Sequence, residues 1–152
     1  MTSEAETVTA HVADMIPLIR ATVEAGGTAE MTVTGNSMKP LLLDRESSVR
    51  LVKADGLKKG DIVLFMSGDE HYVLHRIMRV GDGVYDIIGD NRRTAEVNIP
   101  EANIIAKVKE YNRTGKRWVS GDALYRTALP GIKLARRCYG KARRMAKRLI
   151  TK

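Results

Sequence analysis

Ser37 is the residue whose surroundings most suggest chemistry. It lies in the segment 35–40, which reads GNSMKP and follows a run of alternating apolar and polar residues. A sharp turn at the end of a strand can present a hydroxyl and an N–H group to a substrate carbonyl. A serine hydroxyl is a poor nucleophile, however, until a neighbouring base takes its proton. Because a lone serine between glycine and proline is also typical of an ordinary turn, a nucleophile here requires a base elsewhere in the chain.

Three histidines are candidates for this base: His11, His71 and His75. His11 falls in an expected N-terminal helix. His75 falls in the middle of an apolar run and shares one face of an expected strand with Val73 and Ile77. We therefore expect His75 to face the core, where burial can shift the pKa of the imidazole and its tautomer can be fixed. His75 is the candidate base, although a histidine on an apolar strand face is often only a core residue.

An acidic side chain would orient the imidazole of His75. Two carboxylates are candidates: Asp90, in the sequence Gly89-Asp90-Asn91, and Glu96, six residues after Asp90. Nucleophile, base and orienting group are recognised by their geometry and not by their order in the chain. The sequence leaves the choice between Asp90 and Glu96 open, and Gly89-Asp90-Asn91 also suits a plain hairpin turn.

The hydrophobic periodicity predicts a helix followed by a β unit. Ser3 and Glu6 have the spacing of a capping box, apolar residues recur at helical spacing up to Val23, and Gly26-Gly27 provides a stop. The period then changes to two, as in half-buried strands. We expect strands at 28–34, 49–53, 62–66, 72–80, 84–88 and 104–111. Their short connections leave no room for crossover helices, so the β unit should be mainly antiparallel.

Length and composition indicate one folded domain with a basic C-terminal end. The 152 residues are 43% apolar and 29% charged, which is ordinary for a globular protein. A single cysteine excludes an intramolecular disulfide and favours a reducing compartment. We expect neither a membrane-spanning helix nor a signal peptide. The net charge of +8 is concentrated in residues 126–152, which hold ten basic and no acidic residues on an expected amphipathic helix.

Four short motifs, in this order, resemble the motif set of the superfamily that unites signal peptidases with LexA-type repressor autoproteases. They are GNSMKP at 35–40, GDIV at 60–63, His75-Arg76 and GDN at 89–91. The first motif is similar to that of the repressor autoproteases. A histidine followed by arginine is similar to the archaeal and endoplasmic-reticulum signal peptidases. The resemblance covers roughly residues 33–110, and each motif gains its specificity from the order of the set.

This resemblance implies a fold, an activity and a set of site residues. The fold would be α+β and mainly β: an N-terminal helix at 1–27 packed on the core, a coiled antiparallel peptidase-like β domain at 28–120 and a basic amphipathic helical tail at 121–152. The activity would be that of a signal-peptidase-like serine endopeptidase, with Ser37 as nucleophile and His75 as general base. In the signal peptidase branch the acidic partner lies past the Gly-Asp motif, a position that Glu96 matches better than Asp90.

A second hypothesis is a catalytically inactive module of the same fold that binds an extended peptide. A third, a repressor-type regulator, is disfavoured because no helix-turn-helix pattern precedes the β unit. The basic tail suits an anionic membrane surface better than nucleic acid, because its apolar face is continuous. We expect a peptide or protein substrate, no metal or organic cofactor, and a cytoplasmic location with peripheral contact to the inner face of the membrane.

Overall fold

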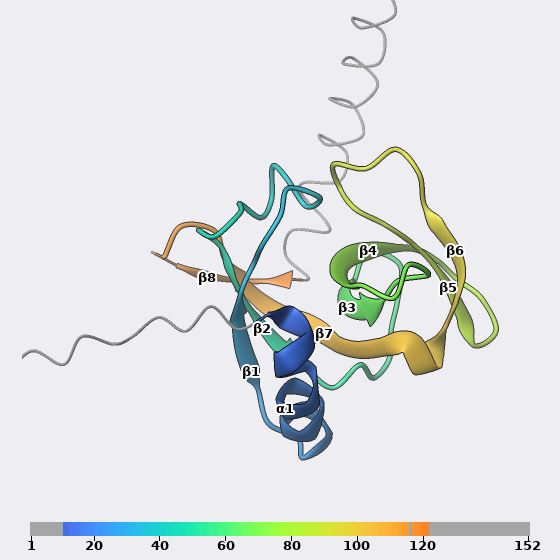
Figure 1. The fold of residues 1–152 in the computed structure, drawn as a ribbon, viewed down its shortest axis with the longest axis horizontal. Helices are drawn as coiled ribbons and strands as arrows, with labels where there is room; N and C mark the ends of the chain where they lie inside the picture. The colour runs from blue at the N-terminus through green and yellow to red at the C-terminus, as the bar shows by residue number, and fades with distance from the viewer. Residues whose placement is uncertain (1–10, 116, 122–152) are drawn as a thin grey trace, which may run out of the picture.

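The computed structural model describes residues 11–115 and 117–121, which form one α-helix and an antiparallel sheet of eight strands. The helix α1 spans Val12–Glu24, and a short 3-10 turn, η1, spans Glu101–Asn103. The strands follow the order β1-β2-β7-β3-β4-β5-β6, and β8 pairs with β7 (Figure 1). Their bounds are Ala29–Thr32 (β1), Ser48–Val52 (β2), Ile62–Met66 (β3), Tyr72–Val80 (β4), Val84–Ile88 (β5), Glu96–Pro100 (β6), Ile104–Asn112 (β7) and Trp118–Ser120 (β8). This architecture confirms the prediction of a mainly antiparallel β fold with an N-terminal helix.

The central strands agree best with their sequence prediction. β3, β4 and β5 begin and end at the predicted residues. β1 is shorter than predicted because the chain leaves the sheet after Thr32. β6 and β8 were not predicted. β6 holds Pro100 and a left-handed residue, Asn98 (φ 54°), and it forms one end of the strand order, where a proline removes no hydrogen bond between two paired neighbours.

The helix begins later than the sequence pattern predicts. His11 has an extended backbone (φ −61°, ψ 143°) and precedes the first helical residue, Val12. The prediction of one helix from Ser3 to Val23 that includes His11 is therefore wrong. The apolar spacing continues through His11, so the pattern carries no sign of this extended residue. The predicted capping box and the predicted helical tail lie outside the described residues.

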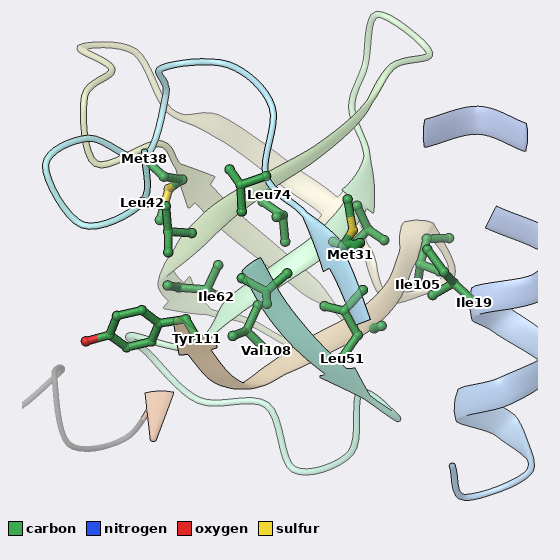
Figure 2. Packing of buried hydrophobic residues seen from close by; sticks show 14 of the residues in the cluster. Ile19, Met31, Met38, Leu42, Leu51, Ile62, Leu74, Ile105, Val108 and Tyr111 are labelled. Atoms are coloured by element: carbon green, nitrogen blue, oxygen red, sulfur yellow. The ribbon is translucent and has the colours of Figure 1, made fainter. Parts of the chain in front are cut away.

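Two groups of buried apolar side chains cover the two faces of the central strands. β3 divides between them, because Leu64 points into one group and its neighbours Val63 and Phe65 point into the other. The larger group extends from α1 to the loop after β1, where Met38 and Leu42 are buried (Figure 2). The residue after Ser37 is thus anchored in the main core.

Within residues 11–115 and 117–121, α1 is too short and too polar to cross a lipid bilayer. Its buried side, formed by Ile16, Ile19 and Val23, faces the sheet. Figure 1 shows α1 beside β1, β2 and β7, and these are the strands that it contacts. The helix closes the same core into which Met38 inserts.

Candidate active site

Ser37 lies in the loop that connects β1 to β2. The two sides of this loop are joined by main-chain hydrogen bonds, from the Val33 N–H to the Ser47 carbonyl (2.8 Å) and from the Arg45 N–H to the Val33 carbonyl (2.7 Å). Gly35 has a φ of +88°, a value that favours glycine, and its N–H donates to Asp44 Oδ1 (2.8 Å). Ser37 is half-buried in this loop.

A second loop, after β5, is bonded to the residues on both sides of Ser37. The Asn91 N–H donates to the Ser37 carbonyl (2.7 Å), and Asn91 Nδ2 donates to the Asn36 carbonyl (3.1 Å). The Asp90 N–H approaches the Met38 sulfur at 3.5 Å. Three consecutive residues of the first loop are thus held by two consecutive residues of the second, and this arrangement restricts the position of the serine.

The backbone of Gly89 lies beside both the main chain of Ser37 and the ring of His75. A Cβ atom on Gly89 would lie 2.8 Å from the Ser37 carbonyl oxygen and 3.0 Å from His75 Cδ2. Both residues therefore lie directly against the Gly89 backbone, and a side chain at this position would collide with both. The structure thus places the main chain of Ser37 and the ring of His75 on the same side of Gly89, and it shows no hydrogen bond between the Ser37 hydroxyl and the described imidazole nitrogens.

His75 is buried on the strand face that the sequence predicted. Only 8% of it is exposed, and its ring contacts that of Phe65 at a centroid distance of 5.9 Å. Burial lowers the pKa of His75 below its usual value of 6.5, with a smaller raising effect from Glu96, a lowering effect from Arg92 and a raising effect from Asp90. His75 is therefore neutral near pH 7, the form that a general base requires. Neither of its ring nitrogens has a hydrogen-bond partner among the described residues.

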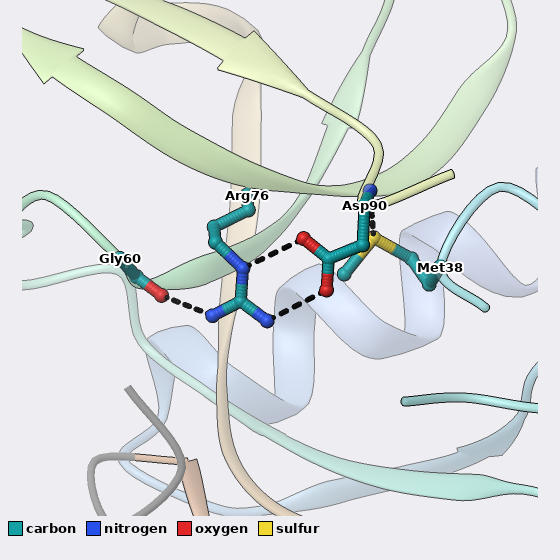
Figure 3. Close-up of polar contacts among 4 residues, drawn as sticks. All are labelled: Met38, Gly60, Arg76 and Asp90. Atoms are coloured by element: carbon teal, nitrogen blue, oxygen red, sulfur yellow. Dashed lines mark hydrogen bonds and ion pairs between the residues drawn. The ribbon is translucent and has the colours of Figure 1, made fainter. Parts of the chain in front are cut away.

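Asp90 forms a buried ion pair with Arg76, the residue directly after His75. Asp90 Oδ1 accepts a bond from Arg76 Nε and Oδ2 accepts one from Nη2, each at 2.8 Å, while Arg76 Nη1 donates to the Gly60 carbonyl at 2.9 Å (Figure 3). Both side chains are almost fully buried. The carboxylate of Asp90 is thus bonded to Arg76 and not to His75. Gly60 belongs to the turn before β3, and this turn accepts a hydrogen bond from the guanidinium.

Glu96 lies at the start of β6, near His75 but not bonded to it. Its Oε2 accepts a hydrogen bond from the Gly68 N–H (3.0 Å), in the turn between β3 and β4. Among charged groups, its carboxylate has the largest effect on His75 and raises the pKa of the imidazole. Of the two acidic candidates, Glu96 retains a carboxylate oxygen with no hydrogen bond to another described residue.

A small hollow of about 60 Å³ opens beside Ser37. Its wall includes Ser37 and Met38 from the first loop, Met31 from β1, Leu74 from β4 and Val12 from α1. The hollow is therefore lined mainly by apolar side chains, with the candidate nucleophile at its edge. In the described parts of the chain, no group of three or more His, Cys, Asp or Glu side chains lies close enough to hold a metal ion.

A comparison with protein families matches residues 2–109 to the description Peptidase S24-like. The chain belongs to the Peptidase S24-like family. This match agrees with the superfamily that the four motifs resemble. A search of curated proteins returned no match to this chain.

In this Peptidase S24-like chain, sequence patterns assigned no role to three residues around the site: Arg76, Asn91 and Arg92. Arg76 and Asn91 belong to the motifs His75-Arg76 and Gly89-Asp90-Asn91. Their place in these motifs is the feature of the sequence that could have pointed to a role. Their roles depend on contacts across 14 and 55 residues of chain, which spacing does not reveal. Arg92 lies next to this motif, and its place beside Gly89 becomes visible only in three dimensions.

Proposed function

We propose that this chain is a serine endopeptidase related to signal peptidases, with Ser37 as nucleophile and His75 as general base. The observation that carries the proposal is that the Ser37 carbonyl and the His75 ring border the same position beside Gly89. The lowered pKa of His75 supports it, because a base must be neutral to accept a proton. Membership of the Peptidase S24-like family supports the same chemistry.

In the proposed reaction, Ser37 Oγ attacks the carbonyl carbon of a peptide bond while His75 takes the hydroxyl proton. The tetrahedral intermediate collapses to an acyl-enzyme, and the proton on His75 passes to the departing amine. A water molecule then attacks the ester carbonyl carbon and gives a proton to His75. His75 passes this proton to Ser37 Oγ as the acyl–oxygen bond breaks, which releases the acid and restores the serine. In this structure the ring nitrogens are unbonded, and catalytic hydrogen bonds often form only when substrate is present.

The backbone around Ser37 supports a site for the oxyanion. Among the described residues, no protein acceptor takes a hydrogen bond from the N–H groups of Ser37 and Met38, so both can donate to a substrate oxygen. For the acidic role we propose Glu96, whose charge favours the protonated imidazole that forms during the reaction. Asp90 would then act through Arg76 as a positioning residue.

The surroundings of Ser37 suggest how a substrate would lie. β1 is the first strand in the sheet order and pairs only with β2, so an extended peptide could add along its other edge and reach Ser37. The hollow beside Ser37 would accept an apolar side chain near the scissile bond, because its lining is mainly apolar.

The alternative is an inactive peptide-binding module of the same fold. The unbonded nitrogens of His75 favour it, since an active triad in its resting form usually joins base and nucleophile. In this case the edge of β1 and the hollow would hold a peptide without cleaving it.

Reaction with a fluorescent serine-directed phosphonate separates the two functions. The wild type should be labelled covalently, Ser37→Ala should lose all labelling, and His75→Ala should lose at least about 100-fold in rate. Ser120→Ala, which changes an exposed serine of β8, is the matched control and should label like the wild type. A folded wild type that shows no Ser37-dependent labelling and cleaves no peptide would establish the binding module instead.

For the basic residues of 126–152 we propose binding to an anionic membrane surface, on the cytoplasmic side, in preference to nucleic acid. Co-sedimentation with vesicles of anionic lipid should occur with the full chain and disappear when residues 126–152 are removed. Vesicles of neutral lipid are the control. Binding to duplex DNA at physiological salt, with none to anionic vesicles, would contradict this proposal.

A further inference from the structure

The side chain of Arg92 begins beside Gly89, next to the Ser37 carbonyl and the His75 ring. Its N–H donates to the Gly89 carbonyl (2.9 Å), which turns the loop back toward the site. Its Cγ lies 2.8 Å from the position that a Cβ on Gly89 would occupy, and the Ser37 carbonyl oxygen and His75 Cδ2 border the same position. The stem of Arg92 is therefore a third neighbour of Gly89, and its guanidinium starts from a point beside the site.

The charge of Arg92 reaches the site without a carboxylate to neutralise it. Its proximity lowers the pKa of His75. The carboxylates that also act on His75 are bonded elsewhere, Asp90 to Arg76 and Glu96 to the Gly68 N–H. Within the described ranges, no ion pair or hydrogen bond involves the guanidinium of Arg92, and the residue is exposed.

Two more cations lie on the same pair of loops. Lys39 is two residues after Ser37, and Arg93 follows Arg92; both are exposed. In the described part of the chain neither is paired with a carboxylate. Two arginines on the strands are paired by contrast, Arg79 with Asp86 and Arg50 with Glu30 and Glu110. Among the described residues, the loops that meet at Ser37 therefore carry three exposed cations without a carboxylate partner.

We propose that Arg92 is a specificity-determining residue, which binds an acidic side chain of the peptide within about two residues of the scissile bond. A guanidinium binds a carboxylate through two parallel hydrogen bonds, and the exposed position of Arg92 leaves it free to do so when substrate arrives. Lys39 and Arg93 add to the attraction at longer range. The inference rests on the proposed peptidase, because it concerns the substrate of the same site.

The test is a cleavage-site profile on a peptide mixture. A synthetic library of random peptides, made with C-terminal amides and free acidic side chains, is incubated with the full chain, and new termini are identified by mass spectrometry. The wild type should cut with Asp or Glu enriched roughly fivefold within two positions of the scissile bond, as expected for an exposed ion pair. Amidation ensures that the enrichment reports acidic side chains and not terminal carboxylates.

Three variants connect the preference to Arg92. Arg92→Glu should reverse it toward Lys and Arg, Arg92→Gln should abolish it, and Arg92→Lys should retain part of it. Arg20→Glu makes the same change of charge at an exposed position of α1 and should leave the preference intact. The ratio of acidic to neutral sites is compared within each variant, so a change in overall rate does not affect it.

The outcomes separate the two proposals. Ser37-dependent cleavage without acidic enrichment, or with enrichment that survives Arg92→Glu, would overturn the role of Arg92 and leave the peptidase standing. If no cleavage depends on Ser37, the peptidase proposal fails, and the role of Arg92 fails with it.

Discussion

Asp90 and Arg76 are joined by two hydrogen bonds of 2.8 Å in the interior of the protein. Arg76 follows His75 in β4, and Asp90 precedes Asn91, whose N–H is bonded to the Ser37 carbonyl. The ion pair therefore connects the strand of the candidate base to the loop that fixes the candidate nucleophile. Arg76 also donates to the Gly60 carbonyl. The pair thus links four segments: β4, the loop after β5, the loop of Ser37 and the turn before β3.

Removing one member of this pair should destabilise the fold strongly. Asp90→Asn leaves a buried guanidinium without its counter-charge, and we expect a loss of about 3–5 kcal/mol in the free energy of unfolding, measured by urea denaturation. Asp86→Asn is the matched control, since it breaks an Arg–Asp pair whose arginine is exposed, and it should cost about 1 kcal/mol or less. Equal losses in the two variants would contradict the importance of burial.

Asn91→Ala should slow the reaction of Ser37 with little effect on stability. The change removes the bond from Nδ2 to the Asn36 carbonyl but keeps the backbone bond to Ser37. We expect about 1 kcal/mol of lost stability or less and about a tenfold slower labelling by a serine-directed phosphonate. Asn103→Ala removes a comparable bond, to the Met66 carbonyl, away from Ser37. It should lower stability by a similar amount and leave the labelling rate unchanged.

Much of this fold follows from local sequence pattern, and the site follows only in part. Apolar residues located β3, β4 and β5: β3 is a continuous apolar run buried on both faces, and β5 alternates between buried and half-buried residues. The same alternation placed His75 on the buried side of β4. β6 escaped prediction because Pro100 and Asn98 break the pattern, and its pairing with β5 depends on tertiary contacts.

The role of the acidic residues illustrates where sequence reasoning ends. Asp90 and Glu96 are six positions apart on one connection, and both influence the pKa of His75. Their difference arises from Arg76, which binds both oxygens of Asp90 from the neighbouring strand β4. Spacing in the sequence does not predict which carboxylate pairs with Arg76, because the pairing depends on the three-dimensional positions of Asp90 and Glu96.

Gly89→Ala should damage the site because the added methyl group has no room. It would lie 2.8 Å from the Ser37 carbonyl oxygen and 3.0 Å from His75 Cδ2, so the two residues must move apart. We expect about 1–3 kcal/mol of lost stability and a labelling rate at least about tenfold lower. Gly68→Ala is the control, since a Cβ there meets no atom within 4 Å and the N–H that Glu96 accepts is retained. A Gly89→Ala variant with unchanged labelling would show that the contact at Gly89 does not position the pair.

The buried His75 should make the protein less stable in mild acid. Because burial lowers the pKa of His75 in the folded state, the unfolded chain binds a proton more readily below pH 6.5, and stability falls as the pH decreases from about 6.5 toward the lowered folded-state pKa. Urea denaturation at pH 8 and pH 5 should show a loss that is smaller in His75→Gln than in the wild type. His71→Gln, at an exposed position, should keep the wild-type loss. The same lowered pKa predicts that phosphonate labelling of Ser37 keeps more than half of its maximum rate at pH 6.5, where a histidine of ordinary pKa would be half protonated. A labelling rate already halved at pH 6.5 would contradict the burial effect, as would equal acid sensitivity of the wild type and His75→Gln.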